Sequence, residues 1–91
     1  MPRIEWRPHA RDDLVGILTY IAGHDPGAAL ALLEQIEARA GRLADNPRAG
    51  RKGRVNGTRE LVVRPNYVVI YAETEAVITI LRVLHAARQW P

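Results

Sequence analysis

Three side chains that could act on a phosphate lie close together near the C-terminus of this sequence. They are Arg82, His85 and Arg88, and Arg59 begins an apolar stretch that could lie beside them. Arginines can stabilise the charge that develops on a phosphate under attack, and a histidine can move the proton of the attacking hydroxyl. The set is therefore compatible with cleavage of RNA through its 2′-hydroxyl. A histidine at the end of a strand is also a common structural residue, so both interpretations stay open.

Other kinds of active site find little support in the sequence. The chain has no cysteine, and His9, His24 and His85 do not have the spacing of metal ligands. No Ser-His-Asp order, phosphate-binding glycine loop or pair of catalytic carboxylates is present. Tyr67 and Tyr71 lie an even number of residues apart on one apolar stretch, so we expect them to share one face of a strand and to pack there. We expect no metal and no cofactor.

A basic tract runs from residue 48 to residue 64. It holds nearly half of the basic residues of the chain and a single acid, Glu60, which we expect to pair with a neighbouring arginine. A concentrated positive patch attracts an acidic peptide or a phosphate backbone, although it can also serve only as a solvated surface. No RNA-binding motif or stacking aromatic pair accompanies it, so the tract predicts an acidic partner better than it predicts base reading. Its basic residues are Arg48, Arg51, Lys52, Arg54, Arg59 and Arg64.

The first half of the chain is predicted to be mainly helical. Charged and apolar residues alternate over 3–7, which indicates a short strand. Helical spacing of apolar residues predicts a helix over about 9–22, with Gly23 in a left-handed conformation at its end. Asp25-Pro26 begins a second helix, which ends before Asn46-Pro47 and must lie antiparallel to the first. Its expected buried stripe is Leu30, Leu33, Ile36, Ala40 and Leu43.

The second half is predicted to form a sheet. Residues 47–58 are rich in glycine and basic side chains and have no period, which is typical of a loop. The apolar stretches at 59–64, 67–73 and 77–84 are separated by turn-forming residues, which predicts a three-stranded antiparallel meander. A chain of 91 residues can fill one core. We therefore expect a single α+β domain, β-α-α-β-β-β, with an antiparallel helical hairpin packed on a twisted antiparallel sheet.

The stretch from Tyr67 to Ala72 has no polar side on either face. A strand with one face in water alternates apolar and polar residues, so both faces of this strand need cover. The helical hairpin can cover one face. The other could be covered by the loop at 47–58, by the C-terminal tail or by another polypeptide. We favour a protein partner, because contiguous exposed apolar surface on a small domain usually marks an interaction site.

Nearly the whole sequence resembles the RelE/ParE superfamily of bacterial type II toxins. The most specific segments are GTREL at 57–61, YVVIY at 67–71 and ITILRVLH at 78–85, followed by Arg88 and Trp90. The resemblance implies one toxin domain over 1–91 with the fold predicted above. It also implies a cognate antitoxin, of the ribbon-helix-helix, ParD-like kind, whose C-terminal segment wraps the toxin. Operator DNA would be bound only indirectly, through the N-terminal part of that antitoxin.

Members of this superfamily differ in activity. RelE-like members are ribosome-dependent ribonucleases that use several basic side chains and a Tyr or His near the C-terminus, whereas ParE-like members bind DNA gyrase and stall it with cleaved DNA. In this sequence Tyr67, Ala86 and Ala87 stand where nucleases place basic residues, and the ending RVLHAARQWP is more ParE-like. The positions that match the nuclease pattern are Arg59, Arg82, His85 and Arg88.

The resemblance therefore favours a cytoplasmic toxin that inhibits gyrase without being an enzyme. The alternative is a RelE-like endoribonuclease that cuts mRNA on the ribosome, and a third is a toxin fold that only pairs with its antitoxin to regulate transcription. No stretch is apolar for the roughly 20 residues that cross a bilayer, so we expect no membrane association. The residues expected to bind the antitoxin or the target are Arg51, Lys52, Arg54, Arg59, Arg64, Tyr67, Arg82 and Trp90.

Overall fold

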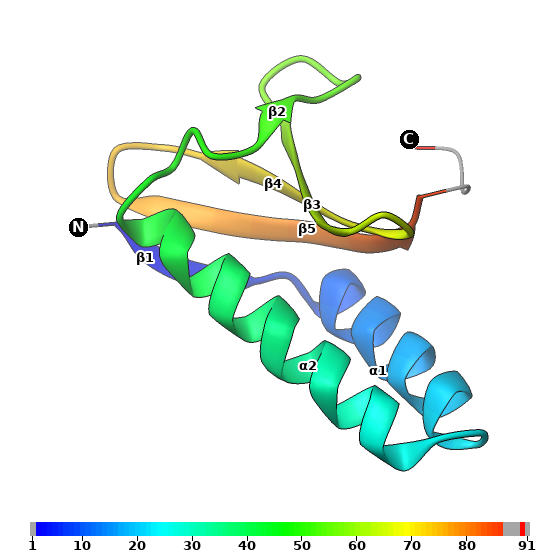
Figure 1. Cartoon of the computed structure of the whole chain (residues 1–91). Helices are drawn as coiled ribbons and strands as arrows, with labels where there is room; N and C mark the ends of the chain where they lie inside the picture. The colour runs from blue at the N-terminus through cyan, green and yellow to red at the C-terminus, as the bar shows by residue number, and fades with distance from the viewer. Residues whose placement is uncertain (1, 87–89, 91) are drawn as a thin grey trace.

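The computed structural model describes residues 2–86 and 90. In this part of the chain, a hairpin of two helices covers one face of a five-stranded sheet (Figure 1), which confirms the predicted α+β class. None of the described helices is long and apolar enough to span a bilayer. The elements, in chain order, are β1 (Arg3–Trp6), α1 (Pro8–Ala22), α2 (Pro26–Gly41), the 3-10 turn η1 (Arg42–Ala44), β2 (Arg51–Lys52), β3 (Arg59–Arg64), β4 (Tyr67–Glu73) and β5 (Val77–His85).

Both helices begin at a proline, where the missing N–H removes no helical hydrogen bond. The Asp25 carboxylate caps α2 by accepting a 3.1 Å hydrogen bond from the Ala28 amide. The expected left-handed conformation of Gly23 was wrong, because its φ of −63° is right-handed. The chain turns directly from α1 into the Asp25 cap, and the Asp25 amide still donates to the Ile21 carbonyl at 2.8 Å. The connection therefore continues right-handed backbone geometry beyond the end of α1.

The sheet has the strand order β1-β5-β4-β3-β2. The antiparallel meander of β3, β4 and β5 is confirmed. Two features differ from expectation. Arg51 and Lys52, within the expected loop, form a short strand on β3, and β1 pairs with β5 in parallel, with Ile4 opposite Ile78. No hairpin turn joins β1 to β5, so nothing in their connection requires them to be antiparallel.

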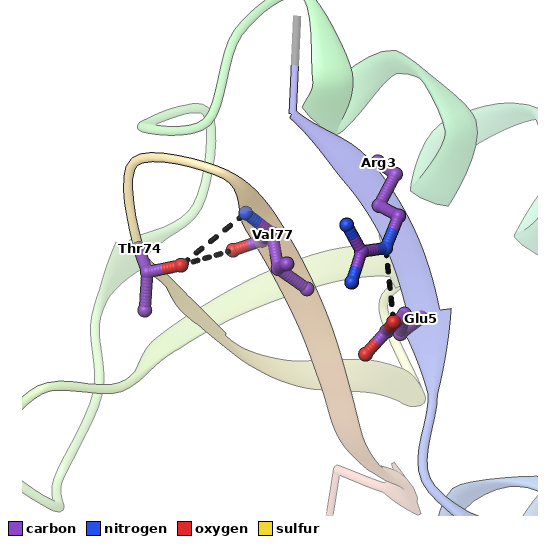
Figure 2. Close-up of polar contacts among 4 residues, drawn as sticks. All are labelled: Arg3, Glu5, Thr74 and Val77. Carbon is purple, nitrogen blue, oxygen red and sulfur yellow. Dashed lines mark hydrogen bonds and ion pairs between the residues drawn. The ribbon is translucent and has the colours of Figure 1, made fainter.

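Figure 2 shows two sets of polar contacts, one in the turn between β4 and β5 and one on the neighbouring edge strand β1. The Thr74 hydroxyl accepts a hydrogen bond from the Val77 amide at 3.2 Å and lies 3.3 Å from the Val77 carbonyl, which closes the turn between β4 and β5. On β1, the Arg3 guanidinium donates to Glu5 at 3.0 Å. Charged side chains on an edge strand discourage pairing with another chain.

The main core lies between the helices and the sheet. Leu32 and Ile36 of α2 pack there against Tyr71, Ile78 and Ile80 of the sheet, all of them buried. The stripe predicted for α2 was partly wrong. Leu30 is 56% exposed, because the start of α2 lies at the end of the hairpin that projects past the sheet (Figure 1). The buried face of α2 consists of Ala29, Leu32, Ile36 and Ala40.

The opposite face of the sheet carries a second, smaller apolar cluster. Val68, Ile70 and Leu84 are only 7%, 2% and 4% exposed, and Leu81 and Trp90 pack against them. The favoured cover, another polypeptide, was therefore wrong for this cluster, and Trp90 of the C-terminal tail, one of the alternatives, packs on it instead. The chain covers it with its own C-terminal tryptophan, because one large indole shields the three aliphatic side chains of this short, twisted sheet.

Candidate functional site

The basic tract is organised around the buried carboxylate of Glu60. Glu60 accepts two hydrogen bonds from the Arg51 guanidinium, at 3.0 and 3.2 Å, and one from the Arg54 amide at 3.4 Å. Glu60 forms an ion pair, as predicted, but its partner is Arg51, nine residues earlier, and not the adjacent Arg59, which donates to the Gly50 carbonyl. These bonds hold β2 and the start of the following loop on the edge of β3. Arg51 thus has a structural role in addition to its exposed position.

Tyr71, which lies in the main core, anchors the segment that leads into β2. Its buried hydroxyl donates to the Pro47 carbonyl at 2.6 Å and accepts from the Gly50 amide at 2.9 Å. Burial raises the pKa of Tyr71 above its ordinary value of 10.0, although the Gly50 hydrogen bond and the charge of Arg59 oppose this. A side chain at Gly50 would collide with the Tyr71 ring, since an added Cβ would lie 2.8 Å from Cε1. The packing of Tyr71 is therefore structural, as predicted.

The other basic side chains of the tract fall into two groups, those that bond to groups within the fold and those that have no acidic partner. Arg59 donates to the Gly50 carbonyl at 2.8 Å, and Arg64 donates to Gln35 on α2 at 2.6 Å, at the opposite end of β3. Arg48 lies 3.6 Å from Glu73. Among the residues that the structure describes, the side chains of Lys52 and Arg54 are exposed and have no acidic partner. Lys52 and Arg54, hereafter the basic edge, are therefore available to bind an acidic ligand.

Arg82, a candidate catalytic residue, forms an ion pair with Asp13 of α1, which the sequence did not predict. Its guanidinium donates to both carboxylate oxygens of Asp13 on α1, at 2.7 and 3.0 Å, and the Val83 amide donates to the same carboxylate at 3.0 Å. The side chains of Arg82 and Asp13 are only 16% and 9% exposed. No local signal in the sequence pairs Asp13 with a residue so far along the chain.

Near the pair of Asp13 and Arg82, α1 and the ends of β4 and β5 enclose a cleft of about 440 Å³. Tyr67 and His85 pack there edge to face, with ring centroids 5.5 Å apart and an interplanar angle of 78°. Asp12, Gly16 and Tyr20 line it from α1. This cleft, hereafter the α1 cleft, therefore combines aromatic rings with carboxylates.

The residues expected to form a nuclease site do not come together in the described part of the chain. Arg59 lies opposite Tyr71, whereas His85 lies opposite Tyr67, four residues earlier in β4. That separation along an extended strand is about 13 Å. Arg82 is held by Asp13, and Arg88 lies outside the described residues. Within residues 2–86 and 90, no three His, Cys, Asp or Glu residues cluster as metal ligands would.

Among the described residues, most of the exposed large apolar side chains lie on the helical hairpin, and Val62 of β3 is the exception. Val15 and Tyr20 of α1 are 63% and 72% exposed, and Leu30 of α2 is 56% exposed. A shallow apolar groove of about 290 Å³ runs between the helices. It is lined by Leu18, Thr19, Ala22, Ala29, Leu30 and Leu33. This hairpin groove was missed in the sequence, because every one of its apolar residues also fits a pattern of buried helix positions.

Comparison with known proteins places this architecture in a family. The model of the ParE toxin of type II toxin-antitoxin systems, parDE, matches residues 4–90. The protein Y4kP of Sinorhizobium fredii is 38% identical over 89 residues, which make up 98% of this chain and 93% of the relative. The toxin RelE2 of Caulobacter vibrioides is 36% identical over 88 residues, or 97% of this chain and 99% of the relative.

Solved structures agree with these sequence relatives. The chromosomal ParDE toxin-antitoxin system from P. aeruginosa contains a chain that superposes with a TM-score of 0.80 and 27% identity, over 93% of this chain and 96% of that one. The toxin-antitoxin complex DinJ-YafQ of E. coli shares the fold, with a TM-score of 0.66 and 18% identity over 96% of both chains. The chain thus belongs to the ParE toxin family of type II toxin-antitoxin systems.

Proposed function

We propose that this toxin acts on DNA gyrase by binding it, not by cleaving RNA. The observation that carries the proposal is the dispersal of the expected nuclease residues. Arg59 is bonded to the Gly50 carbonyl, Arg82 is neutralised by Asp13, and His85 lies at the other end of β4 from Arg59. Phosphoryl transfer needs cations aimed at one phosphate and a proton carrier within hydrogen-bond reach of the same point. The resemblance to a ParDE system favours the same function.

One contact favours the RelE-like alternative. Tyr67 and His85 pack against each other in the lining of the α1 cleft, and both side chains can carry a proton. A relative that is 36% identical also bears the name RelE2. In a ribonuclease, these two residues would act on the 2′-hydroxyl of a bound message, while Arg59 and Arg82 would have to leave their present partners to reach the phosphate. That rearrangement makes this the second candidate.

We also propose a cognate antitoxin as the partner of this chain. Two surfaces suit such a partner. An acidic segment would pair with Lys52 and Arg54 on the basic edge, and apolar side chains would cover Tyr20 and Leu30 on the helical hairpin. A ribbon-helix-helix, ParD-like antitoxin would add contact with operator DNA through its own N-terminal part. The protein encoded beside this chain is the one to test.

A paired assay separates the two activities. The purified toxin is added to gyrase with relaxed plasmid, and separately to a translating ribosome with end-labelled message. The gyrase proposal expects cleaved plasmid and loss of supercoiling with the message intact. Codon-periodic cuts in the message, with gyrase unaffected, would contradict it. If neither gyrase nor the message is affected but the chain captures the adjacent gene product, the third hypothesis is favoured, in which the chain only pairs with its antitoxin to regulate transcription.

Two variants sharpen this assay. His85→Gln removes the proton carrier, so it should leave gyrase inhibition unchanged and would abolish message cleavage in a ribonuclease. Lys52→Glu combined with Arg54→Glu reverses the charge of the basic edge and should weaken binding of an acidic partner, an effect that added salt diminishes in the parent. Arg3→Glu, on the opposite edge of the sheet, changes the net charge by as much as one of these reversals, so it is the matched control for Lys52→Glu and Arg54→Glu measured singly.

A further inference from the structure

The α1 cleft has a chemical character opposite to that of the basic edge. Asp12, Gly16 and Tyr20 follow one another at helical spacing, so they line one stripe of α1 that forms a wall of the cleft. Tyr67 and His85 come from the ends of β4 and β5, and Ile17 and Val83 provide apolar lining. A chain with a net charge of +3 thus presents an acidic and aromatic recess at one place.

The two carboxylates of this recess differ in what they already bind. Asp13 accepts three hydrogen bonds, two from Arg82 and one from the Val83 amide. Asp12 is exposed, and it has no hydrogen-bond or ion-pair partner for its side chain within the described part of the chain. One negative charge of the α1 cleft is therefore uncompensated. An apolar ligand that covered it would bury an unpaired carboxylate at considerable cost.

Gly16 provides the space for a ligand. A Cβ added there would meet no atom within 4 Å, so the wall of the cleft is open between Asp12 and Tyr20. Glycine in the interior of a helix is unfavourable by roughly 0.5 to 1 kcal/mol relative to alanine. Gly16 thus makes α1 less stable and leaves a gap in the wall of the cleft beside its aromatic lining.

We propose that the α1 cleft binds an arginine side chain from a partner polypeptide. The flat guanidinium can stack on Tyr67 while its N–H groups point in the ring plane toward Asp12. A lysine ammonium would meet the same charge but has no planar face to stack. The proposal rests on the proposed antitoxin only for the identity of the partner, and it adds that the segment crossing α1 carries an arginine.

The test uses the isolated chain and a small probe. Nα-acetyl-arginine amide is titrated into ¹⁵N-labelled protein and followed by NMR, with Nα-acetyl-citrulline amide as the neutral isostere and Nα-acetyl-lysine amide as the non-planar cation. Chemical-shift changes should be confined to the lining of the α1 cleft, and the citrulline probe should bind at least about fivefold more weakly. Equal affinity for the arginine and citrulline probes would overturn the proposal.

Variants locate the binding. Asp12→Asn should weaken the arginine probe about fivefold, and Gly16→Leu should abolish binding by filling the gap. Gly41→Leu is the matched control, because Gly41 is also a helical glycine with no atom within 4 Å of an added Cβ and does not line the cleft. Unchanged probe affinity in Gly16→Leu would contradict the proposal even if Asp12→Asn had an effect.

The same variants separate this inference from the proposed function. If the adjacent gene product binds the parent and all variants equally, the antitoxin proposal stands and the arginine contact is wrong. If the arginine probe binds in the α1 cleft but no gene product neutralises the chain, the cleft stands and the proposed partner is wrong. Loss of gene-product binding in Asp12→Asn and Gly16→Leu, with Gly41→Leu unaffected, is the result expected when both hold.

Discussion

The Asp13 carboxylate lies 2.7 Å from Arg82 Nε and joins α1 to β5. The same carboxylate accepts the Val83 amide, next to the point where the register of β4 and β5 shifts. β1 pairs with β5 only as far as Ile80, so no ladder bond from β1 reaches the Val83 amide, and the side-chain carboxylate satisfies it instead. Asp13 thus ties a helix to an irregular strand through two different donors. Arg82, which the sequence suggested could bind a phosphate, therefore stabilises the fold.

Removing either side of this pair should lower the stability of the toxin. Arg82→Ala leaves a nearly buried carboxylate without its cation, and Asp13→Asn weakens the bonds to both donors, so each should lower the free energy of unfolding by about 2 to 4 kcal/mol. Urea denaturation followed by circular dichroism measures this. Arg3→Ala, which breaks the exposed pair with Glu5, should change stability by less than about 0.5 kcal/mol. Equal effects of Arg82→Ala and Arg3→Ala would show that Arg82 is free for function.

The same carboxylate should make stability depend on pH in the acid range. Burial alone would favour the protonated form, but the hydrogen bonds from Arg82 and Val83 outweigh it and hold the pKa of Asp13 below its ordinary value of 3.8. A pKa that is lower in the folded state contributes stability that is present above pH 3.8 and is lost as the pH falls through the folded value. Unfolding curves between pH 6 and pH 2 should therefore converge for the parent and Asp13→Asn. A constant difference across that range would contradict the assignment.

Tyr71→Phe should loosen the basic tract. The substitution keeps the ring in the core but leaves the Gly50 amide and the Pro47 carbonyl without their buried partner, at a cost of about 1 to 3 kcal/mol. Hydrogen exchange should speed up at Gly50 and in β2 more than in β4. Tyr67→Phe is the matched control, because no hydrogen bond of the Tyr67 hydroxyl holds this loop. Uniform destabilisation without faster exchange at Gly50 would argue against the anchor.

Most of the fold could be predicted because its signals are local. Prolines and Asp25 mark the helix starts, and the apolar stretches of β3, β4 and β5 are separated by recognisable turns. The parallel pairing of β1 with β5 could not be predicted, since the two strands lie at opposite ends of the sequence and no turn joins them. The exposure of Leu30 escaped prediction for a related reason: helical spacing shows which face is apolar but not where the sheet beneath it ends.

The candidate site was harder to predict than the fold. An ion pair of Glu60 could be predicted because Glu60 is the single acid in a basic tract, but its partner Arg51 is set by the pairing of β2 with β3, which the sequence did not predict. The engagement of Arg82 by Asp13 depends on how α1 crosses the sheet, which no spacing in the sequence encodes. The α1 cleft escaped notice altogether, because Asp12, Gly16 and Tyr20 resemble ordinary solvent-facing helix positions until Tyr67 and His85 are placed beside them.

Trp90 offers a last prediction, which tests how the second face of the sheet is sealed. Its ring packs on the cluster of Val68, Ile70 and Leu84, while its Nε1 is buried with no hydrogen-bond partner among the described residues. Trp90→Ala should expose the cluster, lower stability by about 1 to 3 kcal/mol and increase binding of the dye ANS.

Trp90→Phe is the discriminating control, since it keeps an aromatic cover and removes the unpartnered N–H. An unsatisfied buried donor is unfavourable, so the phenylalanine variant should match the parent in stability within about 1 kcal/mol and should not bind more ANS. If Trp90→Phe instead fell to the stability of Trp90→Ala, the indole N–H would have a partner in the folded protein and the cover would depend on that bond. Trp90 covers Val68, Ile70 and Leu84 but leaves an apolar hollow beside Leu81, so the proposed partner has this hollow as well as the helical hairpin and the basic edge to dock on.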